Sequence, residues 1–192
     1  GSRANREKAV YINKEKNTVE TLNLNYLFDS MKSFAEISDS DLNIEGAAYS
    51  NNEWYFFNRG NGPGNKNIIF TVQGNNLVDD FNLFFNEFEL PKIDNVSTGF
   101  SDGIVIKNKF YFLATAENSN STYADGKIGG TLFGCINLKK MKLEYTQVIS
   151  TTNKFEGIAL YSLKGKNAVF LLGEDDDVQK KETEIYKLEI KL

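Results

Sequence analysis

Three short acidic-glycine steps are the first feature of this sequence that could do chemistry. They are Glu45-Gly46, Asp102-Gly103 and Glu156-Gly157, spaced 57 and 54 residues apart, and each opens an apolar run that an aromatic run follows. If the steps occupy one position of a structural repeat, their three carboxylates converge on a shared point. Ca²⁺ takes oxygen ligands only. Glu45, Asp102 and Glu156 are therefore a candidate calcium site.

Two alternatives account for the same carboxylates. Converging carboxylates repel one another unless they are protonated, hydrogen-bonded or bridged by a cation. In the first alternative, each acid accepts backbone N–H bonds from a neighbouring repeat and so joins the repeats together. In the second, the acids have a catalytic role. The spacing alone does not separate these three interpretations.

A second set of polar residues follows the aromatic runs. When the repeats are aligned with one another, Arg59, Thr115 and Gly173 share one position. Asn61, Glu117 and Asp175 share a second position nearby. Loops that gather at one end of a rigid scaffold commonly carry binding residues. The predicted ligand-binding residues are Arg59, Asn61, Thr115, Glu117, Glu174 and Asp175. Arg59 could clamp a carboxylate or phosphate through its planar fork, or it could form an ion pair with a neighbouring acid.

The absence of histidine among the 192 residues narrows the chemistry. It removes Ser-His-Asp and Cys-His catalysis and histidine-based zinc sites within this chain. Cys135 is the single cysteine and lies between apolar residues, so it is expected to be a small core side chain. No complete nucleophile–base pair is present, and no catalytic residue is predicted.

Charge and hydropathy bear on partners and location. The net charge of −4 and the pI near 5.1 argue against a nucleic-acid partner, which normally needs a basic face. No segment approaches the ~20 apolar residues of a membrane span, and no signal peptide is visible. The location is not fixed by these features. A periplasmic, cell-envelope or secreted setting is favoured over the cytoplasm.

A unit of four strands explains the repeat. The acidic step leads into strand one, the aromatic run is strand two, and two further strands follow a polar loop. One domain over 1–192 is expected, divided into a half-unit at 1–24, a helical insertion at 25–40, full units at 41–97 and 98–151, and a last unit at 152–192. Apolar residues from Leu24 to Ile37 are spaced as in one amphipathic helix that caps a face of the sheets.

Four-stranded units repeated around an axis are the blades of a β-propeller, which uses ~4 to 8 of them. The fold prediction is therefore all-β, with about three blades of a five- or six-bladed ring. Three blades cannot close a ring, so the missing blades are expected from upstream sequence or from a second chain. A two-sheet sandwich is the alternative architecture.

The sequence also resembles a known family. Its repeat segments, including Trp54-Tyr55-Phe56-Phe57, Phe112-Leu113-Ala114-Thr115 and Leu171-Leu172-Gly173-Glu174, are similar to an uncharacterised family of bacterial β-propellers that is known as a domain of unknown function. The Glu-Gly step is more distantly similar to esterase-like phytase and gluconolactonase-type propellers, which implies acidic residues near the axis that hold Ca²⁺. The first resemblance implies a fold and no activity.

These observations favour a binding module that uses the loop-bearing face around a central channel for a ligand or a protein. The alternative is a Ca²⁺-dependent hydrolase of phosphoesters or lactones, in which the metal replaces the missing histidine as the activating group. Apart from this possible Ca²⁺, no cofactor is predicted. Whether the protein is an enzyme is left open, with the sequence leaning against it.

Overall fold

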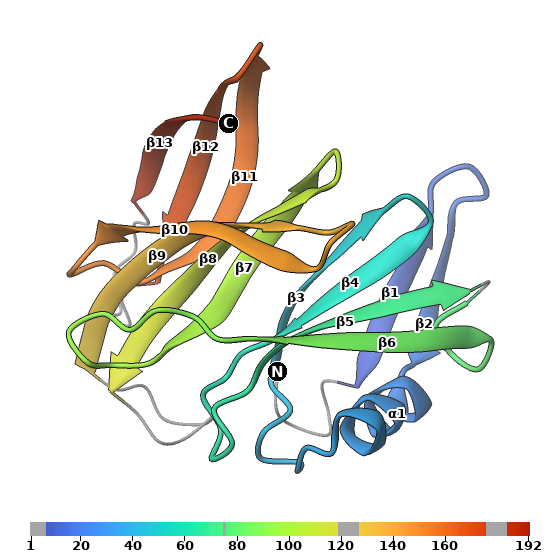
Figure 1. Cartoon of the computed structure of the whole chain (residues 1–192). Helices are drawn as coiled ribbons and strands as arrows, with labels where there is room; N and C mark the ends of the chain where they lie inside the picture. The colour runs from blue at the N-terminus through green and yellow to red at the C-terminus, as the bar shows by residue number, and fades with distance from the viewer. Residues whose placement is uncertain (1–6, 75, 119–126, 176–183) are drawn as a thin grey trace.

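The computed structural model describes residues 7–74, 76–118, 127–175 and 184–192. Apart from one short helix, its secondary structure consists of antiparallel strands in sheets of two to four strands (Figure 1). The all-β prediction is therefore confirmed. Within the described residues, no sheet closes into a ring.

The N-terminal part is a hairpin followed by the helix. Strands β1 (Lys8–Asn13) and β2 (Thr18–Asn23) form a two-stranded sheet, and α1 (Asn25–Ala35) begins directly after β2. The helix ends where Glu36 adopts the left-handed conformation, at φ 51°, and Ile37 N–H then bonds back to Lys32 O at 3.0 Å. The predicted amphipathic helix is thus present.

Three meander sheets follow, and in each one the strands lie in chain order. The first contains β3 (Ile44–Ser50), β4 (Glu53–Asn58), β5 (Asn67–Gly74) and β6 (Phe81–Phe88). The second contains β7 (Thr98–Ile106), β8 (Lys109–Asn118), β9 (Lys127–Asn137) and β10 (Lys142–Ser150). The third contains β11 (Phe155–Lys164), β12 (Asn167–Glu174) and β13 (Ile185–Lys191).

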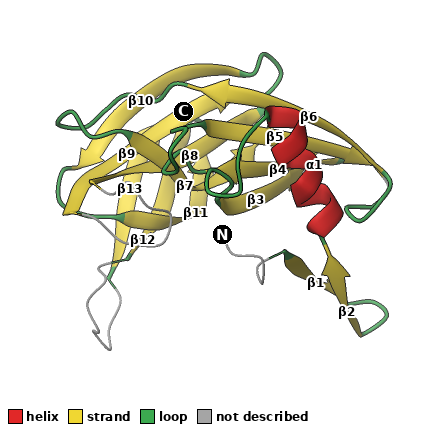
Figure 2. Ribbon diagram, turned by 90° about the horizontal axis from the view of Figure 1, so that it is seen from below, coloured by secondary structure: helices red, strands yellow, loops and turns green. Residues whose placement is uncertain are grey.

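The three meander sheets stand side by side, with their first strands next to one another. Strand β7 contacts both β3 and β11, and Figures 1 and 2 show the sheets spreading outward from these strands. The hairpin β1–β2 and helix α1 lie beside the first sheet. We call the end of the three sheets at which β4, β8 and β12 finish the loop face.

Tight turns connect the first and second strands at the opposite end. Asn51 and Asn52 have φ values of 54° and 61°, Lys107 has 60°, and Gly165 has 62°. Asn and Gly tolerate this left-handed region, which two-residue hairpin turns require. The sequence places such residues in the left-handed region at the first and third turns, whereas at the second turn the left-handed residue is Lys107. The longer connections lie at the loop face.

Apolar side chains fill the spaces between neighbouring sheets. Phe57 stacks on Phe110 between the first and second sheets, with ring centroids 4.4 Å apart. Between the second and third sheets, Phe133 and Phe170 are 5.4 Å apart, and Cys135 is fully buried in the same cluster. Burial raises the pKa of this thiol to about 11, as expected for a core cysteine rather than a nucleophile.

Helix α1 covers one face of the first sheet. Its buried residues share an apolar cluster with Phe56, Ile68, Phe70 and Val72. No helix among the described residues has the length and apolar character that crossing a membrane requires.

Candidate functional site

A β-bulge lies near the loop face in the first ladder of each meander sheet. The bulged residues, which the pairing skips, are Glu45, Ser101 and Glu156. By this pairing Ser101, and not Asp102, is the counterpart of Glu45 and Glu156. The sequence alignment matched Asp102 to Glu45 and Glu156 because all three are acidic. Strand pairing instead matches Ser101 to them, so the predicted alignment of the three acids is wrong by one residue in the second sheet.

Asp102 joins two sheets through backbone hydrogen bonds. Its Oδ2 accepts from the Ile158 N–H of strand β11 at 2.8 Å, and its Oδ1 accepts from the Gly103 N–H at 2.8 Å. Burial raises the pKa of Asp102, while these two hydrogen bonds act in the opposite direction. This is the inter-repeat bonding that was one of the alternatives for the acidic residues.

Glu45 has a different environment. Its Oε1 accepts a hydrogen bond from Asn43 Nδ2 at 2.6 Å, and Asn43 also donates to Asn61 Oδ1 at 3.2 Å. Among the described residues, no three His, Cys, Asp or Glu side chains group as they would around a metal ion. Calcium ligation by Glu45, Asp102 and Glu156 stays a prediction.

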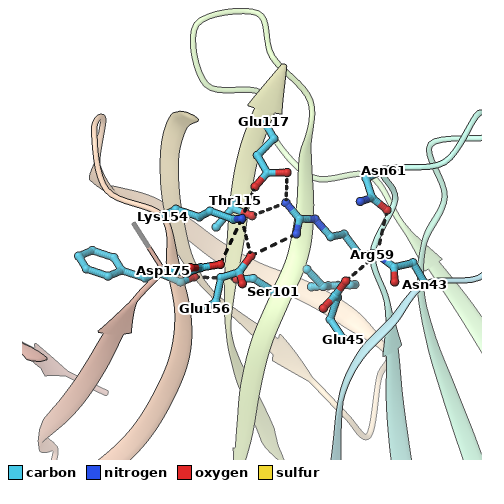
Figure 3. Close-up of polar contacts among 12 residues, drawn as sticks. Asn43, Glu45, Arg59, Asn61, Ser101, Thr115, Glu117, Lys154, Glu156 and Asp175 are labelled. Carbon is cyan, nitrogen blue, oxygen red and sulfur yellow. Dashed lines mark hydrogen bonds and ion pairs between the residues drawn. The ribbon is translucent and has the colours of Figure 1, made fainter. Parts of the chain in front are cut away.

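Glu156 belongs to a buried ionic cluster, which Figure 3 shows in close-up. Its Oε1 lies 3.3 Å from both Arg59 Nη1 and Lys154 Nζ. Glu117 pairs with the same two cations, at 2.9 Å from Arg59 Nη2 and 2.8 Å from Lys154 Nζ. We call Arg59, Glu117, Lys154 and Glu156 the ionic cluster. It links all three meander sheets, since Arg59 follows β4, Glu117 lies on β8, and the other two residues precede and begin β11.

The cluster is withdrawn from solvent. The exposed fractions of the Arg59, Lys154 and Glu117 side chains are 6%, 3% and 7%, and that of Glu156 is 30%. Burial raises the pKa of Glu156, whereas Lys154 and Arg59 lower it and Asp175 raises it further. The Asp175 carboxylate lies 3.5 Å from Lys154 Nζ. The two cations thus face three carboxylates, and each cation has at least two acidic partners.

A missing side chain in the second sheet lets Arg59 reach this cluster. Arg59, Thr115 and Asp175 occupy equivalent ladder positions, since Arg59 N–H bonds to Asn43 O and Asp175 N–H bonds to Lys154 O. The alignment of the repeats, which placed Gly173 with Arg59 and Thr115, is therefore wrong by two residues in the third sheet. A Cβ added at Gly99 would lie 2.6 Å from Arg59 Cγ, far inside contact distance. The glycine leaves the space through which the arginine crosses the second sheet, where its Nη2 donates to Thr115 Oγ1 at 2.9 Å.

Next to the cluster the loop face is hollowed into a cleft of about 680 Å³. The cleft is lined by Arg59, by the 60–65 loop, by Asn95, Val96 and Ser97, and by Gly99, Thr115 and Glu117. Arg59 Nε is buried and has no hydrogen-bond partner among the described residues. Within the same part of the chain, the side chains of Asn65, Asn95 and Ser97 also make no hydrogen bond or ion pair. The cleft therefore offers several uncommitted polar groups.

The structure separates the six predicted ligand-binding residues into two groups. Arg59, Asn61, Thr115 and Glu117 line the cleft. Glu174 lies apart from it and accepts hydrogen bonds from Asn153 Nδ2 and the Tyr186 hydroxyl, while Asp175 is close to Lys154. Residues 176 and 177 of the acidic run Asp175-Asp176-Asp177 are outside the described part of the chain.

Lys154 was missed in the sequence, although a signal for it exists. Asn43-Ile44-Glu45-Gly46 and Lys154-Phe155-Glu156-Gly157 share a polar, apolar, Glu, Gly order. Their first residues occupy equivalent positions at the loop face, each ahead of a bulge. Extending the repeat by two residues toward the N-terminus would have included Lys154 in the candidate site.

A family model described as a family of unknown function (DUF6929) matches residues 1–190. No curated protein and no solved structure matches the chain.

Proposed function

Because the chain belongs to this family of unknown function (DUF6929), its role has to be inferred from the site, and we propose that it is a binding module for an uncharged polar ligand. The ligand lies in the cleft beside Arg59. The observation that carries this proposal is the Arg59 side chain, which is 94% buried, lines the cleft and leaves Nε without a partner.

Charge balance favours an uncharged ligand. Both Nη atoms of Arg59 are already engaged by Thr115, Glu117 and Glu156, so two carboxylates already balance the positive charge of the guanidinium. An anion at Nε would be repelled by these carboxylates and would meet no uncompensated positive charge. A hydroxyl or amide oxygen, in contrast, can accept from Nε and leave the ionic cluster intact.

The other cleft residues fit the same ligand class. Asn65, Asn95 and Ser97 supply amide and hydroxyl groups that donate and accept, and they are not engaged elsewhere among the described residues. Binding sites use a small number of such polar groups to fix the orientation of a ligand. No role as nucleophile or base is assigned to any of them.

Titration of the ¹⁵N-labelled chain tests this proposal. The probes are the blocked tripeptide acetyl-Ala-Ser-Ala-amide and the neutral sugar maltotriose, each at up to about 10 mM so that millimolar binding is visible. At least one probe is expected to shift the amide resonances of residues 59–65 and 95–99. If neither probe shifts them, the proposal is wrong.

A variant pair makes this test specific. Asn95→Gly removes a side chain from the cleft without backbone strain, because Asn95 has a φ of 66°. Asn52→Gly is the matched control, at φ 61° in a turn at the opposite end of the sheets. Binding should weaken about fivefold in the first variant, the loss expected for one hydrogen bond, and stay unchanged in the second.

The three meander sheets support a further proposal for the architecture, namely that they are blades of a five- or six-bladed propeller. Their first strands lie side by side and the remaining strands lead away from them. A structure of the chain with its natural flanking sequence or with a second copy checks this. More four-stranded sheets must continue the row, and two sheets packed face to face would contradict it.

A calcium site at Glu45, Asp102 and Glu156 is a separate proposal, and calorimetric titration with CaCl₂ tests it. Uptake that Asp102→Asn weakens would support it. No heat at millimolar Ca²⁺, the weak end of natural calcium sites, would contradict it.

A further inference from the structure

A second hollow adjoins the cleft beside Arg59. Its volume is about 440 Å³, and it shares two lining residues with the cleft, Asn65 and Ser97. Beyond them it is bounded by the segment that leaves strand β6, with Glu87, Glu89 and Lys92 in its wall. The two hollows therefore meet at a junction made of one amide and one hydroxyl side chain.

On the basis of the proposed function, we infer that the ligand is an extended peptide segment that spans both hollows and places a basic side chain in the second one. The extended shape of the ligand follows from the way the two hollows adjoin. A ligand that fills both of them has to pass Asn65 and Ser97, which line both hollows. These two residues have uncommitted polar groups, and a peptide offers an N–H and a C=O at every residue to pair with them.

The charges of the second hollow are the reason for the basic side chain. Glu87 and Glu89 form no ion pair among the described residues, and Lys92 is the one cation in the same wall. Two unpaired carboxylates against one ammonium leave a negative excess at this end. A cationic side chain is attracted there, whereas the cleft at the other end favours uncharged groups.

The wall composition argues for a peptide over an oligosaccharide. Among the residues that the structure describes, neither hollow is lined by tryptophan or tyrosine, and the aromatic residue in the second wall, Phe88, is 7% exposed. A sugar ring consequently finds no open aromatic face to pack on, and what remains are amides, hydroxyls and carboxylates.

Three blocked pentapeptides test this inference: acetyl-Ala-Ser-Ala-Lys-Ala-amide and its counterparts with Gln or Glu in place of Lys, each also in reversed order. In one of the two orders, the Lys peptide should bind about three- to fivefold tighter than the Gln peptide, the range of an exposed charge pair. The Glu peptide should bind weakest. Resonances of residues 87–92 should shift with the pentapeptides and not with the tripeptide.

The double variant Glu87→Gln/Glu89→Gln should remove the preference for Lys and leave tripeptide binding unchanged. The matched control Glu20→Gln/Glu189→Gln changes the net charge equally at exposed positions of β2 and β13, and it should keep the preference. A preference lost equally in both variants would show a general charge effect and overturn the inference.

The remaining outcomes separate this inference from the proposed function. If the tripeptide binds in the cleft and no pentapeptide gains affinity or shifts residues 87–92, the extension is wrong and the binding module stands. If maltotriose binds and the peptides do not, the peptide class is wrong. If no probe binds at all, the proposed function is wrong, and this inference falls with it.

Discussion

The two joints between neighbouring sheets are built alike in their apolar parts and differently in their polar parts. We call the joint between the first and second meander sheets the first joint, and the one between the second and third the second joint. At the first, Asn67 Oδ1 accepts from Phe100 N–H at 3.1 Å, and at the second, Thr131 Oγ1 accepts from Phe155 N–H at the same distance. These residues occupy equivalent ladder positions. Each of the two side chains also donates a hydrogen bond, Asn67 Nδ2 to Thr98 O and Thr131 Oγ1 to Asn153 O. The repeat thus copies both the apolar filling and two hydrogen bonds.

The acidic residues break this similarity. At the second joint Asp102 crosses to Ile158 and Ser101 donates to Phe155 O at 2.9 Å, whereas at the first joint Glu45 bonds to Asn43 of its own sheet. Arg59 starts in the first sheet and ends at Glu156 of the third. The comparison teaches that the repeated positions hold the sheets together, while the candidate site is made where the repeat is not kept.

Removing an aromatic ring from either joint should have the largest effect. Phe110→Ala at the first joint and Phe170→Ala at the second, which are equivalent ladder positions, each delete a fully buried ring that touches at least two others. Each should lower the free energy of unfolding by about 3–5 kcal/mol, as measured by urea denaturation. If one costs less than half of the other, the two joints are not equivalent in their apolar part.

Filling the space at Gly99 should have the next largest effect. Gly99→Ala forces Arg59 out of its path and should lower the free energy of unfolding by about 1–3 kcal/mol. Gly157→Ala is the control, because its Cβ would meet only Gly173 atoms at 3.8 Å.

A double-mutant cycle with Arg59→Met sharpens this result. Without the contacts of the guanidinium to Glu117, Glu156 and Thr115, the methionine side chain of this variant is free to move its Cγ away from residue 99. Gly99→Ala should then cost less than in the wild type, with a coupling of about 0.5–3 kcal/mol, as for residues in contact. Strictly additive losses would show that the glycine does not act through Arg59.

The hydrogen bond at the second joint should matter less. Thr131 Oγ1 also donates to Asn153 O at 2.7 Å, so Thr131→Val leaves the buried Phe155 N–H and the partly buried Asn153 O without this partner. The expected loss is about 1–2 kcal/mol. Thermal unfolding of Thr131→Val next to Thr146→Val, on the outer strand β10, measures it, and equal melting temperatures for the two would argue against the role of Thr131.

The smallest effect concerns pH. Because the pKa of Glu156 is raised above its ordinary value of 4.5, its contribution to stability is fully present below that value and is lost as the pH rises through the folded-state pKa. From pH 7 to pH 5, the wild type should therefore gain stability relative to Glu156→Gln, by at most about 1.4 kcal/mol for each unit of pKa shift. A difference that shrinks instead would contradict the burial argument.

Asp41 is the comparison of opposite sign. Partial burial raises the pKa of Asp41, but hydrogen bonds from the Ser38 hydroxyl and the Gly64 N–H lower it more. The pKa therefore lies below its ordinary value of 3.8. The wild type should lose stability relative to Asp41→Asn as the pH falls below 4. Urea midpoints across this range measure the difference.

The repeat could be predicted from sequence because its signals are local. Acidic-glycine steps, aromatic runs and Asn or Gly turns each occupy a few adjacent residues, and strands and turns follow from them. The register at Ser101 could not be predicted in the same way, because Asp102 is adjacent and shares the acidic character on which the alignment depended. Which of the two residues forms the bulge depends on how strand β7 pairs with β8, and this pairing is not visible in the local sequence.

The ionic cluster is harder still to foresee. The sequence identifies Arg59, Glu117 and Glu156 as polar residues at one end of the sheets, yet which of them meet depends on the path of one long side chain. That path exists because Gly99 lacks a side chain. The residues around Gly99 in the sequence give no sign that an arginine packs against it. The contacts of Lys154 likewise come from the packing of one sheet beside another.

The position of the single tryptophan has a practical consequence. Trp54 lies near the turn end of β4, packed 5.0 Å from the Tyr49 ring, while Arg59 follows the other end of that strand. Five residues of extended chain place about 16 Å between them. Tryptophan fluorescence should therefore change when the first meander sheet unfolds and change little when a ligand binds in the cleft. A dye attached near Asn95 would report ligand binding separately, so that unfolding and binding can be followed by two independent optical signals.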